Sequence, residues 1–189
     1  MSILDHPLGN PDHLPDAIVY AAQMTAAALP ELDPKTRRIL ELTADGTSLG
    51  DALGITKEQK QALLDLGCRL IQVGELEKAT DVLLRLNQYD PLMEPALYAL
   101  GVICQMRGEL QKAAFMYTQF LALDATNPMG YLRVGECLIA AGEFSEARAT
   151  LEMAKLFAAE GKGQPGNLAE AETLLAHPDV AAAPLPQTS

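Results

Sequence analysis

The chain has 189 residues, of which 49% are hydrophobic and 21% charged, a composition typical of a folded globular protein rather than a disordered one. Its 25 acidic residues outnumber 14 lysines and arginines, giving a net charge of −11, which argues against nucleic acid and anionic membrane surfaces as partners. Three scattered cysteines are too few for a disulfide framework. Because the sequence shows neither a membrane-spanning apolar run nor a signal-peptide pattern, we expect a cytoplasmic protein without stable membrane insertion.

Residues 1–14 predict a disordered lead, because two prolines and a glycine interrupt any helical pattern. His6 and His13 lie in this lead, each next to an aspartate. A metal ion would need its ligands held in a fixed geometry, which a disordered lead does not supply. We therefore expect no metal site in this segment.

Three helices are predicted in an N-terminal helical segment that spans residues 15–59. The first covers 15–29, is rich in alanine and ends at Pro30. Its apolar side chains recur at helical spacing and form one stripe, which consists of Ile18, Val19, Ala22 and Ala26. The other two helices are predicted near 34–44 and 48–53, the latter between two glycines.

From about residue 60 the chain repeats itself with a period of 34 residues. Small residues recur at that spacing in three sets of three. The sets are Gly67, Gly101 and Gly135; Gly74, Gly108 and Gly142; and Ala79, Ala113 and Ala147. A period of 34 residues with this pattern is that of the tetratricopeptide repeat, a helix–turn–helix unit. The sequence therefore resembles a stack of three such repeats.

Each small residue has a packing role in a repeat of this kind. The first glycine set and the alanine set lie on facing helices, where a larger side chain would hold the two backbones apart. The second glycine set follows the first helix of each pair, where a left-handed cap favours glycine. The sequence therefore predicts an all-α solenoid of three antiparallel helix pairs with N-terminal helices in front. The predicted pairs are 60–73 with 76–88, 94–107 with 110–123, and 128–141 with 144–158.

The last repeat needs a capping element, because a terminal repeat would otherwise expose its apolar face. Asn167 followed by Glu170 has the pattern of an N-cap with an acidic partner, and predicts a capping helix over 168–176. The loop before it is too rich in glycine and proline to be helical. Residues 60–177 are thus expected to form the repeats with their cap, and the Ala/Pro-rich residues 178–189 a mobile tail.

The concave surface of a tetratricopeptide stack is lined mainly by positions two, five, nine and twelve of each repeat's first helix. Counted from residue 60, the fifth and ninth positions hold no lysine or asparagine, which family members that grip an acidic C-terminus carry there. An apolar groove instead suits a hydrophobic or proline-containing extended segment. The candidate groove residues are Leu64, Cys68, Ile71, Tyr98, Val102, Gln105, Met129, Leu132 and Glu136. Alternatively, some of them pack against N-terminal helices folded into the groove.

No catalytic constellation can be assembled from this sequence. We find no Ser/His/Asp set and no paired catalytic carboxylates, and the Gly46-Thr47-Ser48-Leu49-Gly50 stretch lacks the lysine of a phosphate loop. The cysteines form no Cys-x-x-Cys pair, and buried apolar thiols are the simplest interpretation. We expect a binding protein that is not an enzyme and that needs no cofactor.

The stretch from Asp45 to Thr56 runs directly into the first repeat and reads Asp-Gly-Thr-Ser-Leu-Gly-Asp-Ala-Leu-Gly-Ile-Thr. This stretch followed by three tetratricopeptide repeats resembles the class II chaperones of bacterial type III secretion, which keep pore-forming translocators soluble before export. The resemblance covers about residues 45–158. It implies a cytoplasmic homodimer that uses the N-terminal helices as its contact, with the stripe from Ile18 to Ala26 as candidate. It also implies a groove that takes a Pro-x-Leu-x-x-Pro-like segment of a hydrophobic translocator.

Two function classes remain open at this point. The first is an export chaperone for hydrophobic translocators, and the alternative is a general tetratricopeptide adaptor or scaffold for a secretion apparatus or another complex. The tail also contains Ala183-Pro184-Leu185-Pro186, an extended apolar segment loosely similar to such a ligand. It is a candidate occupant of the groove when no client is bound, although a solvated tail is the simpler expectation.

Overall fold

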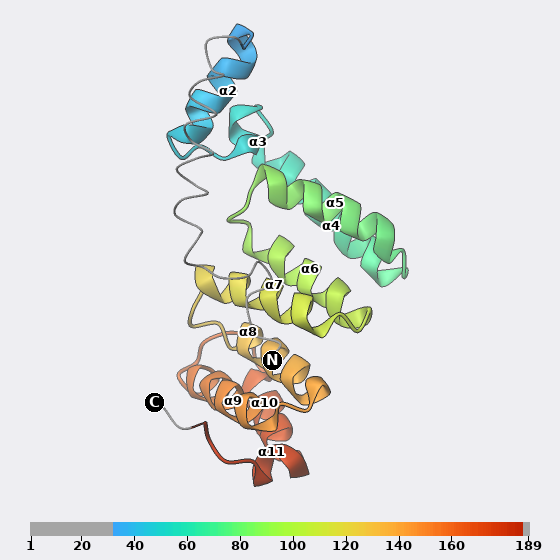
Figure 1. Cartoon of the computed structure of the whole chain (residues 1–189), viewed down its shortest axis with the longest axis vertical. Coiled ribbons are helices and arrows are strands. Elements are labelled where there is room, and N and C mark those ends of the chain that lie inside the picture. Colours follow the sequence, from blue (N-terminus) through green and yellow to red (C-terminus); the bar gives the residue numbers. More distant parts are fainter. Residues whose placement is uncertain (1–31, 187–189) are drawn as a thin grey trace.

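The computed structural model describes residues 32–186, in which all regular secondary structure is helical. The helices follow one another as antiparallel neighbours that stack along a single axis (Figure 1). The predicted all-α class is therefore confirmed. The disordered lead over 1–14 and the predicted helix over 15–29, with Ile18, Val19, Ala22 and Ala26, lie outside the described residues.

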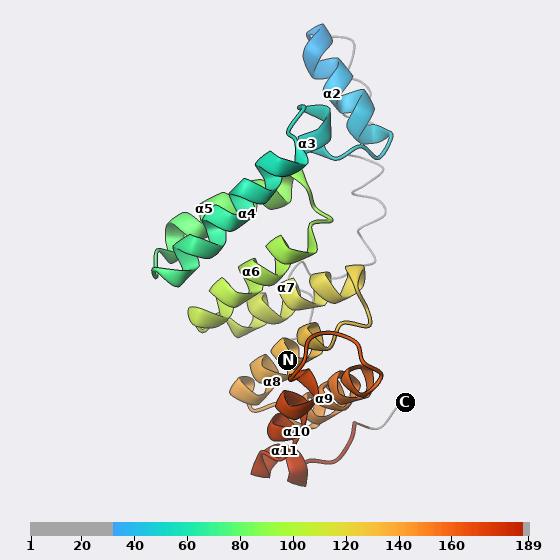
Figure 2. The same ribbon diagram turned by 180° about the vertical axis from the view of Figure 1, so that it is seen from behind.

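The three helix pairs are present within one to three residues of the predicted bounds. The first helix of each pair contacts a first helix or the cap of the neighbouring unit, since α4 packs on α6 and α8 packs on α10, so these helices line one side of the stack (Figure 2). The first pair starts earlier than predicted because Thr56 and Gln59 form a capping box. The pairs are α4 (Lys57–Gln72) with α5 (Leu76–Tyr89), α6 (Glu94–Met106) with α7 (Leu110–Leu123), and α8 (Pro128–Ala141) with α9 (Phe144–Ala159).

The first glycine set allows a large side chain of the second helix to lie against the backbone of the first. A Cβ atom on each glycine would fall far inside van der Waals contact with that side chain. The pairs are Gly67 with Leu83 (2.6 Å), Gly101 with Tyr117 (2.5 Å) and Gly135 with Leu151 (2.6 Å). The alanine set is fully buried in the same layer. The repeat period therefore follows from close packing within each helix pair.

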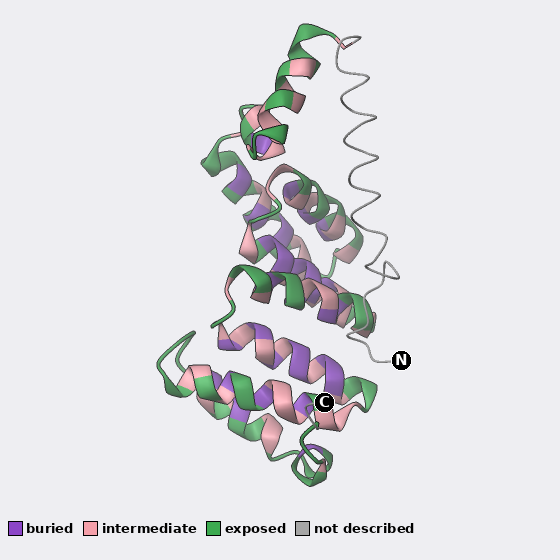
Figure 3. Ribbon diagram, turned by 60° about the vertical axis from the view of Figure 1, so that its left-hand side comes forward, coloured by how far each residue is buried: buried purple, intermediate pink, exposed green. Residues whose placement is uncertain are grey.

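The second glycine set ends the first helices as predicted. Gly74, Gly108 and Gly142 have φ values of +80°, +73° and +77°, in the left-handed region that favours glycine. Buried side chains on either side of these turns run down the middle of the stack, between exposed outer surfaces (Figure 3). The solenoid thus has one continuous interior built from successive helix pairs.

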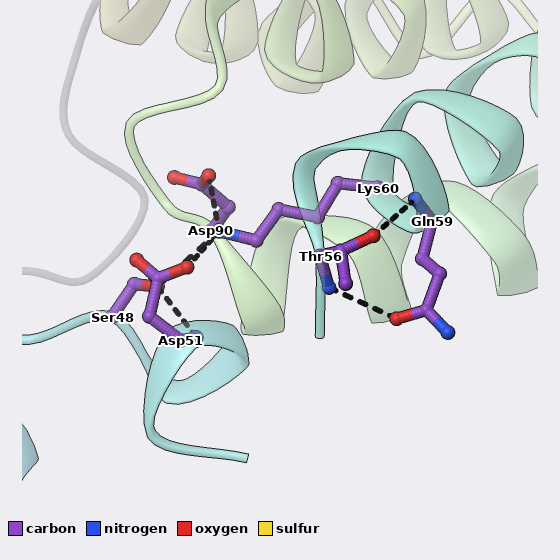
Figure 4. Close-up of polar contacts among 6 residues, drawn as sticks. All are labelled: Ser48, Asp51, Thr56, Gln59, Lys60 and Asp90. Atoms are coloured by element: carbon purple, nitrogen blue, oxygen red, sulfur yellow. Dashed lines mark hydrogen bonds and ion pairs between the residues drawn. The ribbon is translucent and has the colours of Figure 1, made fainter. Parts of the chain in front are cut away.

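Two short helices, α2 (Pro34–Ala44) and α3 (Leu49–Ala52), precede the repeats. The lysine Lys60 holds α3 in place, because its side chain is only 5% exposed and its ammonium group bonds two carboxylates (Figure 4). The Nζ atom lies 2.8 Å from Asp51 Oδ1 and 2.9 Å from Asp90 Oδ2. Gly50 packs against this lysine, and a Cβ atom there would lie 3.0 Å from Lys60 Cε. Since α3 packs on α5, this part of the N-terminal segment does not enter the concave side.

The capping helix is α10 (Asn167–Leu175), but its N-terminus is not capped as predicted. Asn167 is the first helical residue, it is buried, and its Oδ1 atom accepts the Gln164 backbone N–H at 2.7 Å. The residue before it is Gly166, whose φ of +104° reverses the chain. The asparagine therefore closes the preceding loop on itself, whereas the sequence pattern had indicated an N-cap.

The expectation of a mobile tail is wrong for residues 178–186. Residues Pro178–Ala182 form helix α11, which packs on α9 and α10 with Val180 fully buried. Arg148 donates to the Ala183 carbonyl at 2.5 Å, and Ser145 Oγ donates to the Pro184 carbonyl at 2.6 Å. The tail is held on α9 by these contacts, so its Ala-Pro-Leu-Pro segment does not occupy the groove.

Candidate binding groove

The larger of two cavities on the inner side of the stack has a volume of about 520 Å³. Helices α4, α6 and α8 contribute to it together with the loop between α9 and α10. Its walls are mainly apolar, and the side chains that carry the argument below are Leu64, Cys68, Tyr98, Phe120 and Met129. An elongated apolar cavity shared by several helices can accept extended apolar side chains from a partner.

A second cavity of about 380 Å³ borders the first at Tyr98. Val102, Gln105 and Met106 of α6 and Arg133 of α8 complete its lining. The two cavities therefore form a continuous groove along the first helices of the repeats, which we call the concave groove.

Tyr98 is the residue that joins the two cavities. Its ring packs against Tyr117 and Phe120, with a centroid separation of 5.6 Å in both cases. Its hydroxyl oxygen accepts a hydrogen bond from Arg133 Nε at 3.0 Å. The apolar body of this side chain is thus fixed by aromatic packing and its polar end by a guanidinium.

A network of charged and polar side chains crosses the floor of the second cavity. The Arg133 Nη1 atom donates to both carboxylate oxygens of Glu136 at 2.6 and 2.7 Å, and Nη2 donates to Glu170 of α10 at 3.2 Å. Gln105 donates to Glu136 at 2.9 Å and accepts from the Tyr117 hydroxyl at 2.8 Å. Because one guanidinium faces two carboxylates, this floor presents no net positive charge.

The structure places most, but not all, of the predicted groove residues at the cavities. Those that line the larger cavity are Leu64, Cys68, Tyr98 and Met129, and those that line the smaller one are Tyr98, Val102 and Gln105. Ile71 is half-buried against the core of the first repeats, and Glu136 lies in the polar network.

Leu132 does not reach the groove surface, because its side chain is fully buried. The capping helix α10 packs on α8, and Ala171 of α10 belongs to the same buried cluster as Leu132. Position counting missed this because it treats the three repeats alike, whereas the last repeat is covered by the cap. Leu132 is a core residue here.

Four residues at the groove escaped the sequence reasoning. Arg133 falls at the sixth position of its repeat, next to a position that was counted, and Phe120 was assigned to the packing between repeats. Gly163 and Gln164 lie in the loop before α10 and carry no periodic signal. The groove is therefore apolar at positions five and nine, as predicted, but it contains a neutralised cation.

The three thiols differ in their access to solvent. Cys68 is exposed at the larger cavity, Cys104 is half-buried, and Cys137 is buried. Burial raises the pKa of all three, that of Cys137 to about 12. Across residues 32–186 no three potential ligands gather as a metal ion would require. Over the same range, the helices are too short or too polar to cross a bilayer.

Comparison with known proteins gives a family match and several structural likenesses. A model of the tetratricopeptide repeat matches residues 106–161. A search of curated proteins gives no match. The fold is similar to that of a T3SS complex from Aeromonas hydrophila, with a TM-score of 0.66 and 24% identity over 72% of this chain and 91% of that one.

Two further likenesses are to crystal structures in which a peptide is bound. The type III secretion chaperone SycD of Yersinia enterocolitica, in complex with a peptide of the translocator YopD, has a TM-score of 0.60 and 23% identity over 68% of this chain and 94% of that one. PcrH from Pseudomonas aeruginosa, in complex with the chaperone-binding region of PopD, has a TM-score of 0.60 and 23% identity over 68% and 93% of the two chains. The predicted tetratricopeptide solenoid is thereby confirmed.

Proposed function

We propose that the concave groove binds an extended apolar segment of a hydrophobic translocator, and that the chain acts as a cytoplasmic chaperone of type III secretion. The observation that carries this proposal is the pair of adjoining cavities with mainly apolar walls. The similarity of fold to SycD and PcrH, which were solved with translocator peptides, supports the same kind of ligand. The role proposed is binding rather than catalysis.

Binding in such a groove is driven by the burial of a few apolar side chains. Each anchor that leaves water for a dry site contributes about 1.5–3 kcal/mol. Ordering the flexible segment offsets part of this gain. The larger cavity has room for the first anchors beside Leu64 and Met129, and the smaller one for a further anchor beside Val102.

Chaperone action then follows from mass action. A translocator that exposes membrane-seeking segments in water aggregates, and a bound chaperone lowers the free concentration of that exposed form. The net charge of −11 on the chaperone keeps the complex itself soluble, because like-charged complexes repel one another. No change in covalent structure is needed, and release reverses the same equilibrium.

A homodimer is part of the proposal, with the stripe Ile18, Val19, Ala22 and Ala26 as its contact. The existence of an alternative dimer structure of SycD supports an assembly of this kind. Replacing Val19 with aspartate should shift the full-length chain from dimer to monomer in sedimentation analysis. A dimer that persists unchanged would remove this stripe from the contact.

The groove assignment is tested by charging Tyr98. We expect Tyr98→Glu to abolish binding of fluorescent peptides from the chaperone-binding regions of PopD and PopB, because a carboxylate would be desolvated between the two cavities. The matched control is Leu84→Glu, at an exposed position of α5 away from both cavities. Wild-type affinity in the Tyr98 variant, or no binding by the wild type, would contradict the proposal.

The adaptor or scaffold alternative predicts a different result on co-expression. A chaperone should make a membrane-active client soluble that is insoluble alone, whereas a scaffold should bind partners that are already soluble. The solubility of a co-expressed translocator, measured with the wild type and with Tyr98→Glu, separates the two functions.

A further inference from the structure

The loop between α9 and α10 forms a wall of the concave groove, although it lies outside the three repeats. Gly163 and Gln164 line the larger cavity together with Leu64 and Cys68 of the first repeat. The cavity is thus bounded by the first repeat on one side and by a segment about 100 residues further along the chain on the other. Figure 2 shows this loop passing from α9 towards the α7–α8 connection.

The position of the loop is fixed by contacts that leave little freedom. A Cβ atom on Gly163 would lie 2.8 Å from Pro128 Cδ and 2.6 Å from Asn167 Oδ1. Asn167 also accepts the backbone N–H of Gln164, so the loop is pinned both to the start of α8 and to the start of α10. Only glycine fits at position 163, where the φ value is +74°.

A second set of contacts ties α10 to the groove floor. Glu170 of α10 accepts a hydrogen bond from Arg133, whose Nε atom in turn donates to Tyr98. The side chain that joins the two cavities is therefore linked through one guanidinium to the capping helix. The loop at one end of α10 and the ion pair on its first turns act on the same groove.

We propose that the capping segment 161–175 is part of the client-binding site, with the 161–166 loop as a wall that contacts the bound apolar segment. Gly163 and Glu170 are positioning residues that hold this wall in place. The inference rests on the proposed function, since the ligand is the same extended apolar segment. It adds a contact surface from outside the repeats and explains why this loop is built from residues with no helical pattern.

Two glycines of the loop provide a matched pair of variants. Gly161 and Gly163 have nearly equal φ values of +79° and +74°, so alanine strains the backbone similarly at both. Only at Gly163 does the added Cβ collide with neighbours, because nothing lies within 4 Å of the position at Gly161. Gly163→Ala should therefore push the loop away from the cavity, whereas Gly161→Ala should leave it there.

The experiment measures the affinity of full-length variants for fluorescent peptides from the chaperone-binding regions of PopD and PopB and for the YopD peptide. We expect Gly163→Ala to weaken binding about tenfold, as loss of a well-packed contact surface does, and Gly161→Ala to stay within about twofold. Equal affinities of the two variants, with hydrogen exchange showing the loop released in Gly163→Ala, would overturn the proposal. If none of the peptides binds the wild type, the proposed function itself fails.

A second pair of variants decides the matter if Gly163→Ala does not fold. Glu170 and Glu172 are both ion-paired glutamates of α10, but Glu172 pairs with Lys155 of α9. We expect Glu170→Ala to weaken peptide binding about threefold and Glu172→Ala to leave it unchanged, since exposed ion pairs contribute little elsewhere. Equal effects of these two substitutions would show that the cap is not coupled to the site.

Discussion

Lys60 is a buried cation that joins three segments of the chain. We expect Lys60→Met to lower the free energy of unfolding by about 1–3 kcal/mol, because Asp51 and Asp90 would lose their charged partner at the base of α3. Urea unfolding followed by circular dichroism measures the change. The control is Lys78→Met, which removes an exposed pair with Glu75 and should cost less than about 0.5 kcal/mol. Equal losses would contradict the role assigned to Lys60.

The same ion pairs predict a pH dependence. The hydrogen bond from Lys60 holds the pKa of Asp51 below its usual 3.8, and that bond raises the pKa of Lys60 above its usual 10.5. Stability from the carboxylate is present above pH 3.8 and is lost as pH falls through the lowered pKa. Stability from the ammonium is present below pH 10.5 and is lost as pH rises through the raised pKa.

The difference in unfolding free energy between the wild type and Lys60→Met should therefore be constant across neutral pH and shrink at both extremes. Urea titrations at a series of pH values test this. A difference that changes steeply near neutral pH would mean that another group controls this contact.

Single residues were predictable where the repeat pattern fixes their position. Tyr98 and Val102 were found by counting along a first helix, because all helices of this kind present the same face to the groove. Arg133 was not, since one position of error in helical phase moves a side chain by about 100°. Leu132 was misplaced because the sequence of one repeat does not show that a cap will cover it.

Among the elements, the helix pairs depend on a glycine that faces a large side chain. Gly101→Ala should lower the free energy of unfolding by about 1–3 kcal/mol, because its Cβ would lie 2.5 Å from the Tyr117 ring and force the pair apart. Gly108→Ala is the control, at a φ of +73° in open space, and we expect a cost of about 1 kcal/mol from backbone strain alone. A larger loss at Gly108 than at Gly101, in urea unfolding, would refute this account of the period.

The repeat helices were predictable to within a few residues because small residues at 34-residue spacing mark both packing and caps. The 161–166 loop was also recognised as non-helical, and its glycines indeed adopt positive φ values. Helix α11 was missed, because five residues carry too little pattern to distinguish a docked helix from a tail. Its order comes from contacts with α9, which no local sequence feature announces.

For the whole molecule, the solenoid places side chains from distant repeats along one surface. Leu64 and Gln164 line the same cavity although they are about 100 residues apart, because successive repeats and the cap turn around a common inner side. Such a surface is more than the sum of three predicted helix pairs. The sequence indicated its apolar character, whereas the polar floor around Arg133 and the wall formed by the cap required the arrangement of the elements.

Alkylation of Cys68 measures occupancy of the concave groove most directly. This thiol is exposed at the larger cavity, while Cys137 is buried and serves as an internal reference. A Leu84→Cys variant adds a reactive thiol outside both cavities. With a peptide from the chaperone-binding region of PopD present in excess, mass spectrometry should show alkylation of Cys68 slowed about tenfold or more, and that of the cysteine at position 84 unchanged. Full reactivity of Cys68 in a demonstrated complex would contradict binding in this groove.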